Sequence, residues 1–266
     1  SDVCSSDLNH HVGADSLQKL GDEAHDYYRD GFAAASRADE LRCHDLELNV
    51  LESIEDVTER VNAAVPAGMA ADAQRSWAAM FQSRVVGGIA SNVDGKPANR
   101  VLGHDPAGRE WLAFSKLHGF SPAGENVAYS PGHEVVVEQA DDCLVSPFLC
   151  YDLRFPEAFR EASARGAALM LVLANWPARR DRHWRALLVA RAIENQAWVV
   201  GVNRAGTDPN ATYAGRSLVV DPTGVVRADA GEGERWLTLD IDVGEAARWR
   251  AEFPALKDRR MSSAHP

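Results

Sequence analysis

Two long apolar segments limit the folds that this chain can adopt. The first is ALMLVLANW at 168–176 and the second is AWVVGVN at 197–203. A continuous apolar strand is typical of a strand that is buried on both faces of its sheet. Between them, RHWRALLVARAIENQ at 182–196 places Trp184 and Leu188 on one side of a predicted helix. Buried strands that alternate with a helix favour an α/β fold.

The other segments after residue 45 predict hairpins, strands and two more helices. AGMAADAQRSWAAMFQS at 67–83 carries apolar side chains at helical spacing, namely Met69, Ala73, Trp77, Met80 and Phe81. FPEAFREASARG at 155–166 has Pro near its start and Gly at its end, as helices do. Turn sequences and β-branched or alternating runs predict the remaining strands, which lie within 46–51, 84–90, 99–118, 134–150, 215–229 and 235–242. We therefore expect one α/β domain with mixed sheets over residues 46–260, covered by helices.

The N-terminal segment differs from the rest in charge and pattern. The chain has 28 basic and 39 acidic residues, a formal net charge of −11, and residues 1–60 hold 15 of the acidic and 5 of the basic residues. Residues 1–45 show no clean apolar alternation. We expect them to be an atypical segment that is disordered or a sequencing artefact. Their histidines raise the alternative of a metal site, but a solvated stretch is the favoured interpretation.

Composition also excludes several classes of partner. A pI near 5.3 argues against the basic face that nucleic-acid binding needs. The longest apolar run, AALMLVLA at 167–174, is far shorter than the ~20 residues of a membrane span. The four cysteines have the spacing of neither a disulfide framework nor a zinc site. The start SDVCSSDL has no features of a secretory signal, so we expect a reduced, cytoplasmic protein without nucleic-acid or membrane partners.

Cys150 is the most informative single residue for chemistry. It ends the apolar run CLVSPFLC and precedes YDLRFPE, where a helix is expected to begin. A nucleophile at a strand-to-helix turn projects out of the sheet, and backbone N–H groups at the turn point toward a developing oxyanion. The alternative is a buried structural cysteine. A redox pair with Cys143 is disfavoured, because both residues lie along one extended segment and are too far apart to bridge.

Several stretches of the chain resemble the nitrilase, or carbon–nitrogen hydrolase, superfamily. CYDLRFPE at 150–157 is similar to the nucleophile motif of that superfamily. Further stretches resemble its bacterial omega-amidase branch, namely ANWPARRDRHW at 174–184, ARAIENQAWVVGVNRAGTD at 190–208, YAGRSLVVDPTG at 213–224 and WRAEFPALKD at 249–258. The resemblance implies a four-layer α/β/β/α sandwich and a Glu–Lys–Cys triad without metal or cofactor. It also implies a homodimer.

The same resemblance implies which residues form the site. SKLHGF at 115–120 matches the lysine motif, so Lys116 is the expected triad lysine, although Gly119 stands where a larger apolar residue is usual. Glu125 in PAGENVAY matches a second glutamate, which would orient Lys116 or the substrate amide. A surface lysine at a strand end and a solvated loop carboxylate are the alternatives for these two positions.

The N-terminal glutamate of the triad has a weaker match. Glu52 follows the predicted strand at 46–51, without the Pro that usually precedes this glutamate, and Glu55 is the fallback. In the implied chemistry, Cys150 attacks the amide carbonyl to form a thioester. Glu52 would act as general base and then as general acid. Lys116 and the backbone N–H of Tyr151 would stabilise the oxyanion.

The omega-amidase branch implies a small amide substrate that carries a carboxylate. Its members act on 2-oxo dicarboxylic monoamides such as 2-oxoglutaramate and 2-oxosuccinamate, and the far carboxylate favours a bidentate cation. Arg180 and His183 match positions of the branch, and Arg154 is near Cys150 in sequence. A salt bridge with Asp152 or a helix carboxylate is the alternative for Arg154. Trp176 and Tyr151 are expected either to wall the pocket or to pack in the core.

Two other functions remain open. One is a different amidase of the same fold that acts on an N-carbamoyl compound or an aliphatic amide. The other is a catalytically impaired scaffold of the same fold that has lost its general base, because the motif around Glu52 is altered.

Overall fold

The computed structural model describes residues 46–51, 69–93, 96–208 and 211–260. The predictions made for residues 1–45, for Glu52 and for Glu55 lie outside the described residues. All described elements belong to one unit, His44–Pro266. Among the described helices, none has the length and apolar character that crossing a membrane requires.

The central element is a six-stranded mixed sheet. Its order is β12-β11-β8-β7-β6-β5, formed by β5 (Glu138–Ala140), β6 (Cys143–Leu149), β7 (Leu169–Ala174), β8 (Trp198–Asn203), β11 (Leu218–Val220) and β12 (Val226–Asp229). The strands β6, β7 and β8 are parallel, and the outer strands are antiparallel. Every residue of β7 is buried, which confirms the prediction from its continuous apolar sequence.

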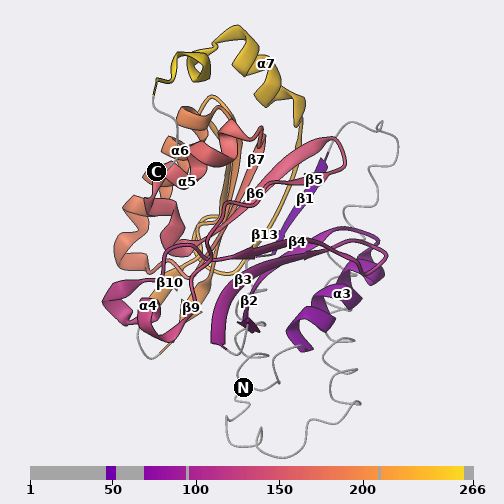
Figure 1. Ribbon diagram of the computed structural model, residues 1–266, viewed down its shortest axis with the longest axis vertical. Coiled ribbons are helices and arrows are strands. Elements are labelled where there is room, and N and C mark those ends of the chain that lie inside the picture. The colour runs from indigo at the N-terminus through magenta and orange to yellow at the C-terminus, as the bar shows by residue number, and fades with distance from the viewer. Residues whose placement is uncertain (1–45, 52–68, 94–95, 209–210, 261–266) are drawn as a thin grey trace, which may run out of the picture. The chain divides into compact units, whose positions relative to one another are not determined.

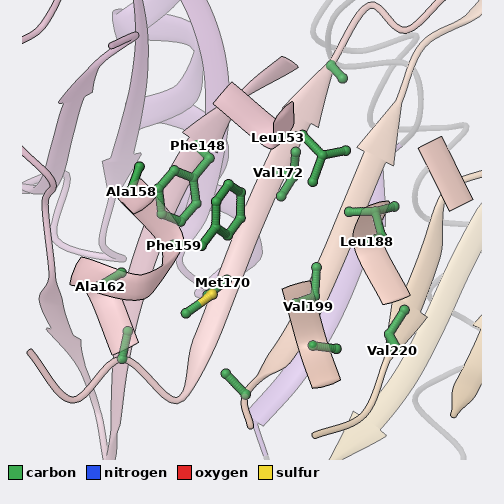
Figure 2. Close-up of a cluster of buried hydrophobic side chains, with 14 of the residues drawn as sticks. Phe148, Leu153, Ala158, Phe159, Ala162, Met170, Val172, Leu188, Val199 and Val220 are labelled. Atoms are coloured by element: carbon green, nitrogen blue, oxygen red, sulfur yellow. The ribbon is translucent and has the colours of Figure 1, made fainter. Parts of the chain in front are cut away.

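Two helices cover one face of this sheet. They are α5 (Pro156–Ala164) and α6 (Asp181–Asn195), close to the predicted ranges. Figure 2 shows the core between them and the strands, where Phe148 of β6 stacks on Phe159 of α5 with ring centroids 3.8 Å apart. Trp184 and Leu188 of α6 are fully buried in the same core. Close packing of large side chains on this face holds the end of β6, and therefore Cys150, in a defined position.

A second sheet packs on the opposite face. It contains β2 (Val85–Val93), β3 (Lys96–His104) and β4 (Glu110–Ser115), all antiparallel. Val101, Leu112 and Phe114 from this sheet share a buried cluster with side chains of β6, β7 and β8. β1 (Leu46–Leu51) pairs antiparallel with β13 (Trp236–Ile241), and Ile241 belongs to the same cluster.

The helix α3 (Met69–Phe81) completes the fourth layer by packing on β2 and β3 (Figure 1). The layers are therefore helix, sheet, sheet and helix, which confirms the expected α/β/β/α sandwich. The expected apolar face of α3 is partly wrong, because Met80 is 45% exposed whereas Gln74 and Ala78 are buried. The face of α3 that points inward instead carries Ala71, Gln74 and Ala78, and Ala71 packs against Ile89 and Leu102.

Short elements connect these layers. Near the strand ends that matter below lie η1 (Ser121–Ala123), α4 (Glu125–Ala128), η2 (Cys150–Arg154), η3 (Ala178–Arg180), β9 (Ala205–Thr207) and β10 (Thr212–Ala214). After β13, the chain ends its described part with α7 (Gly244–Glu252) and η4 (Ala255–Asp258).

Candidate active site

Cys150 stands directly after the last residue of β6. Its φ angle is +44°, a left-handed conformation that is uncommon for a residue with a side chain and that marks a strained turn. Cys150 is partly exposed, and its Sγ atom lies 3.8 Å from the carbonyl oxygen of Asn175, just after the parallel neighbour β7. Cys150 is the first residue of a five-residue 3₁₀ turn, η2, which precedes the start of α5 at Pro156. The thiol is thus presented by a tight turn at the carboxyl ends of two parallel strands.

Cys143, at the other end of β6, has a different environment. It is 2% exposed, and burial raises the pKa of its thiol to about 11. Neither Cys143 nor Cys150 takes part in a disulfide. A buried thiol with a raised pKa is a poor nucleophile, so Cys143 serves as an internal reference for the reactivity of Cys150.

Lys116 and Glu125 form a buried ion pair. The Nζ atom of Lys116 lies 2.7 Å from both carboxylate oxygens of Glu125, and Lys116 is 8% exposed. The amide of Asn99 and the backbone N–H of Phe120 also donate to this carboxylate. Lys116 directly follows β4, and Glu125 is the first residue of α4. The structure therefore brings together two of the residues that the sequence indicated, which rules out a surface lysine and a solvated loop carboxylate.

The charge state of Glu125 follows from these contacts. Burial alone raises the pKa of the carboxyl group, but the charge of Lys116 and the hydrogen bonds from Lys116, Phe120 and Asn99 outweigh it, so the pKa lies below its ordinary value. Glu125 is therefore ionised near neutral pH and has its oxygens occupied by donors. A carboxylate in this state stabilises the ammonium form of Lys116 and is poorly suited to accept a proton.

A cavity of about 150 Å³ opens beside this pair. Lys116, Glu125, Asn99, Gly119 and Tyr129 are among the residues that line it. The volume is below the ~300–1,000 Å³ of pockets for drug-sized ligands, so it suits a small molecule or part of one. Cys150 is not among the lining residues, so this cavity alone does not join the amine to the thiol.

Asp152 connects the segments that carry Lys116 and Cys150. Its side chain is fully buried. One carboxylate oxygen accepts hydrogen bonds from the backbone N–H of His118 at 2.9 Å and from the His118 ring at 2.8 Å. The other oxygen accepts the backbone N–H of Leu149 at 3.1 Å. Asp152 therefore connects His118, two residues after Lys116, to Leu149, the residue before Cys150.

Basic and aromatic side chains gather around the same turns. The guanidinium of Arg154 lies 4.7 Å from the ring centroid of Trp176 and 3.4 Å from Nδ1 of His183. Arg180 lies 5.4 Å from the ring centroid of Phe120, and its carbonyl oxygen accepts the indole N–H of Trp176 at 2.8 Å. Cation–π contacts of this kind orient a guanidinium without neutralising its charge.

Burial and neighbouring charges both act on Arg180. Partial burial and the neighbouring charges of Arg179 and Arg154 lower the pKa of Arg180, whereas Cys150 favours its charged form. Trp176 is only 3% exposed and packs against Trp184, so core packing is the better description of this side chain than a pocket wall.

Three residues of the site were not expected from the sequence. Asp152 was considered only as a salt-bridge partner of Arg154, but its oxygens bind His118 and Leu149. Asn99 donates to Glu125, and an amide side chain within β3 gives no sequence signal of that role. Arg191 is 4% exposed and donates twice to the carbonyl oxygen of Leu153, so α6 supports the turn after Cys150. Of these three residues, only Asp152 has a sequence feature that points to the site, which is its position inside the CYDLRFPE motif.

Comparisons with known proteins agree with this architecture. A family model described as carbon–nitrogen hydrolase matches residues 52–251, and one described as Peptidase S46 matches residues 8–86. The 2-oxoglutaramate amidase of Bacillus subtilis (strain 168) is 36% identical over 176 residues, 66% of this chain and 68% of that protein. Omega-amidase YafV of Yersinia enterocolitica is 38% identical over 197 residues, 73% of this chain and 76% of that protein.

Among solved structures, a CN-hydrolase superfamily protein from Xanthomonas campestris with an arsenic adduct in its active site superposes with a TM-score of 0.71. It is 28% identical, and the match covers 83% of this chain and 99% of that chain. The carbon–nitrogen hydrolase model covers most of the chain, including β6, the Cys150 turn and the Lys116–Glu125 pair. The chain belongs to the carbon–nitrogen hydrolase family.

Proposed function

We propose that this protein hydrolyses the carboxamide of a small 2-oxo dicarboxylic monoamide, and that Cys150 is the nucleophile. The Cys150 sulfur attacks the amide carbon, and its proton passes to a carboxylate. The C–N bond of the tetrahedral intermediate then breaks, and the nitrogen leaves as ammonia with that proton. Water attacks the resulting thioester, which releases the 2-oxo diacid and regenerates the thiol.

In this proposal, Lys116 stabilises the oxyanion together with the backbone N–H of Tyr151. Each such donor is worth about 3–4 kcal/mol in the transition state when it is positioned in advance. The contact between Lys116 and Glu125 supports this role, because it fixes the position of the buried amino group. Glu125 thus orients Lys116 rather than transferring protons. The Lys116–Glu125 pair, joined to the Cys150 turn through Asp152, is the observation that carries the proposal.

The general base belongs to the N-terminal part of the chain. Glu125 is unsuitable because its oxygens are occupied and the pKa of its carboxyl group is lowered. We assign the role to Glu52, with Glu55 as the alternative. If Glu52 is the base, Glu52→Gln loses ammonia release about 10²-fold or more and Glu55→Gln does not. Equal activity of both variants and the unmodified protein would overturn this assignment.

The basic side chains support a substrate with a second negative group. The guanidinium of Arg180 lies over the ring of Phe120, and Arg154 contacts both Trp176 and His183. A guanidinium binds a carboxylate through two parallel hydrogen bonds. The Bacillus subtilis relative is named 2-oxoglutaramate amidase, which agrees with a 2-oxoglutaramate-like substrate, and the Yersinia enterocolitica relative is named an omega-amidase. Arg180 is therefore proposed to bind the far carboxylate, with Arg154 and His183 beside it.

Ammonia release from 2-oxoglutaramate, an N-carbamoyl amino acid and butyramide tests the substrate assignment. We expect the first to be hydrolysed with the highest kcat/KM. Arg180→Gln should raise KM for 2-oxoglutaramate at least about 10-fold and leave butyramide hydrolysis unchanged. The exposed Arg182→Gln on α6 is the matched control and should change neither. Faster hydrolysis of the carbamoyl compound, or no release from any amide, would overturn the proposal.

We also propose that the protein is cytoplasmic, as its cysteine pattern indicated, and a homodimer, as the resemblance implied. Light scattering after size-exclusion chromatography tests the dimer, which would be contradicted by a mass near 29.0 kDa.

A further inference from the structure

We propose that Asp152 is a positioning residue that sets the distance between Lys116 and Cys150, and that it acts through Nδ1 of His118. This inference rests on the roles assigned above to Lys116 and Cys150. It adds that hydrogen bonds of a third residue, Asp152, connect the chain segments of Lys116 and Cys150.

The contacts of Asp152 reach both catalytic segments. His118 follows Lys116 by two residues, and Leu149 immediately precedes Cys150. The carboxylate accepts two hydrogen bonds from His118, at 2.9 and 2.8 Å, and one from Leu149, at 3.1 Å. The strand before Lys116 is β4 of the three-stranded sheet, whereas Cys150 follows β6 of the six-stranded sheet. Asp152 therefore joins the ends of two strands from different sheets.

Burial makes these hydrogen bonds obligatory. The Asp152 side chain is fully buried, and an ionised carboxylate without donors would be strongly destabilised there. A carboxylate oxygen accepts hydrogen bonds, so this contact requires the His118 tautomer with its proton on Nδ1. Removing one donor leaves an oxygen of the buried carboxylate without a hydrogen bond. The chain near His118 or Leu149 must then move to supply another donor.

Ring contacts hold the imidazole in the required orientation. The ring of His118 stacks on Phe155 with centroids 3.7 Å apart and an interplanar angle of 6°. Phe155 in turn contacts Tyr151 edge-on at 5.2 Å. Both aromatic residues belong to the segment that follows Cys150. His118 is thus fixed between the carboxylate and the rings of the same segment, which suits a connection that controls distance.

The backbone strain at Cys150 explains why such a connection is needed. A positive φ angle at a residue with a side chain costs about 1–3 kcal/mol and persists only when surrounding contacts enforce it. The hydrogen bond from Leu149 N–H to Asp152 closes the turn across Cys150. Loss of Asp152 would therefore affect both the direction of the thiol and its distance from Lys116.

Two variants at position 118 separate positioning from other roles. Asn carries an N–H donor close to the place of Nδ1, whereas Leu fills similar space without a donor. We expect His118→Asn to keep kcat within about 5-fold and His118→Leu to lose about 10²-fold, with KM changed less than about 3-fold in both. Asp152→Asn should behave like His118→Leu. The N–H₂ group of the new asparagine would face hydrogen-bond donors and could not accept from them as a carboxylate oxygen does. The melting temperature of each variant shows whether it is folded.

A second measurement is independent of amide turnover. Iodoacetamide should alkylate Cys150 at least about 10-fold more slowly in His118→Leu than in His118→Asn or the unmodified protein, as measured for each cysteine by peptide mass spectrometry. Alkylation of the buried Cys143 should remain slow and equal in all variants. The expected pH profile of kcat is the same in His118→Asn and the unmodified protein.

Each contrary result has a distinct meaning. A folded His118→Leu with unchanged kcat and unchanged alkylation overturns the positioning role. Equal losses in His118→Asn and His118→Leu also overturn it, because a proton-transfer role for the imidazole would then be indicated. If the unmodified protein hydrolyses no amide, the proposed function fails, but the alkylation series still decides whether Asp152 and His118 control the Cys150 turn.

Discussion

The Nζ atom of Lys116 lies 2.7 Å from each carboxylate oxygen of Glu125, so the end of β4 is tied to the first residue of α4. Both side chains are largely buried, and two further donors from Asn99 and Phe120 complete the shell of the carboxylate. The pair therefore holds the amino group of Lys116 in a fixed position beside the cavity.

Replacing Glu125 should change how stability depends on acid. Its pKa is lowered in the folded protein, so its contribution to the free energy of unfolding is present above the pKa of the unfolded chain and is lost as the pH falls through the folded-state pKa. Urea unfolding from about pH 5 to about pH 3 should show a smaller loss of stability for Glu125→Gln than for the unmodified protein.

The exposed Glu138→Gln is a suitable control for this experiment. It should lose stability in acid as the unmodified protein does. If the free energy of unfolding depends on pH in the same way in Glu125→Gln and in the unmodified protein, the ion pair does not lower the pKa of Glu125 as argued.

The absence of a side chain at Gly119 lets α4 approach the Lys116 strand end. A Cβ atom added there would lie 2.8 Å from both N and Cα of Asn126, and backbone atoms cannot yield as a flexible side chain does. We expect Gly119→Ala to displace the segment of Glu125 and lower kcat by about 10²-fold.

Gly244→Ala is the matched control for Gly119→Ala. A Cβ atom at Gly244 would meet only the ends of the Arg248 and Asp242 side chains. It should leave kcat unchanged. Full activity of Gly119→Ala, with its crystal structure showing Glu125 still bound to Lys116, would contradict the argument from packing.

Arg250 should matter for stability rather than for catalysis. Its guanidinium donates to the carbonyl oxygens of Gln196, Ala167 and Asn195, which joins α7 to the end of α6. Arg250→Met leaves these oxygens without their charged donor and should lower the free energy of unfolding by about 2–4 kcal/mol.

Arg248→Met on the same helix provides the comparison for Arg250. Arg248 pairs with Asp242 at the exposed surface, and such pairs contribute little, so the expected change is much smaller than for Arg250→Met. Denaturant titration measures both values. An equal effect of the two substitutions would contradict the structural role assigned to Arg250.

The strands and helices were predictable because their apolar patterns match their burial. The continuous run of β7 is buried on both faces, and the turn sequences DPAG and DPTG connect β3 to β4 and β11 to β12. The buried face of α3 was harder to predict. An Ala-rich helix offers several apolar stripes of similar strength, and the packing against Ile89 and Leu102 decides between them.

Site residues were predictable only where a motif carried them. Lys116 and Glu125 meet as their motifs implied, over a separation of nine residues. The link from Asp152 to His118 spans 34 residues and depends on how two sheets pack, which no local pattern encodes. Asn99 and Arg191 likewise reach the site through tertiary contacts. The general base stays a prediction, because Glu52 and Glu55 lie outside the described residues.

The most direct test of this account is to trap the acyl group during turnover of 2-oxoglutaramate. Acid quenching followed by peptide mass spectrometry should find a thioester on the peptide that contains Cys150. Cys150→Ser should abolish the adduct and lower the rate of ammonia release at least about 10³-fold. Ammonia release that survives this substitution, or an acyl group found on another cysteine, would contradict the assignment of Cys150 as the nucleophile.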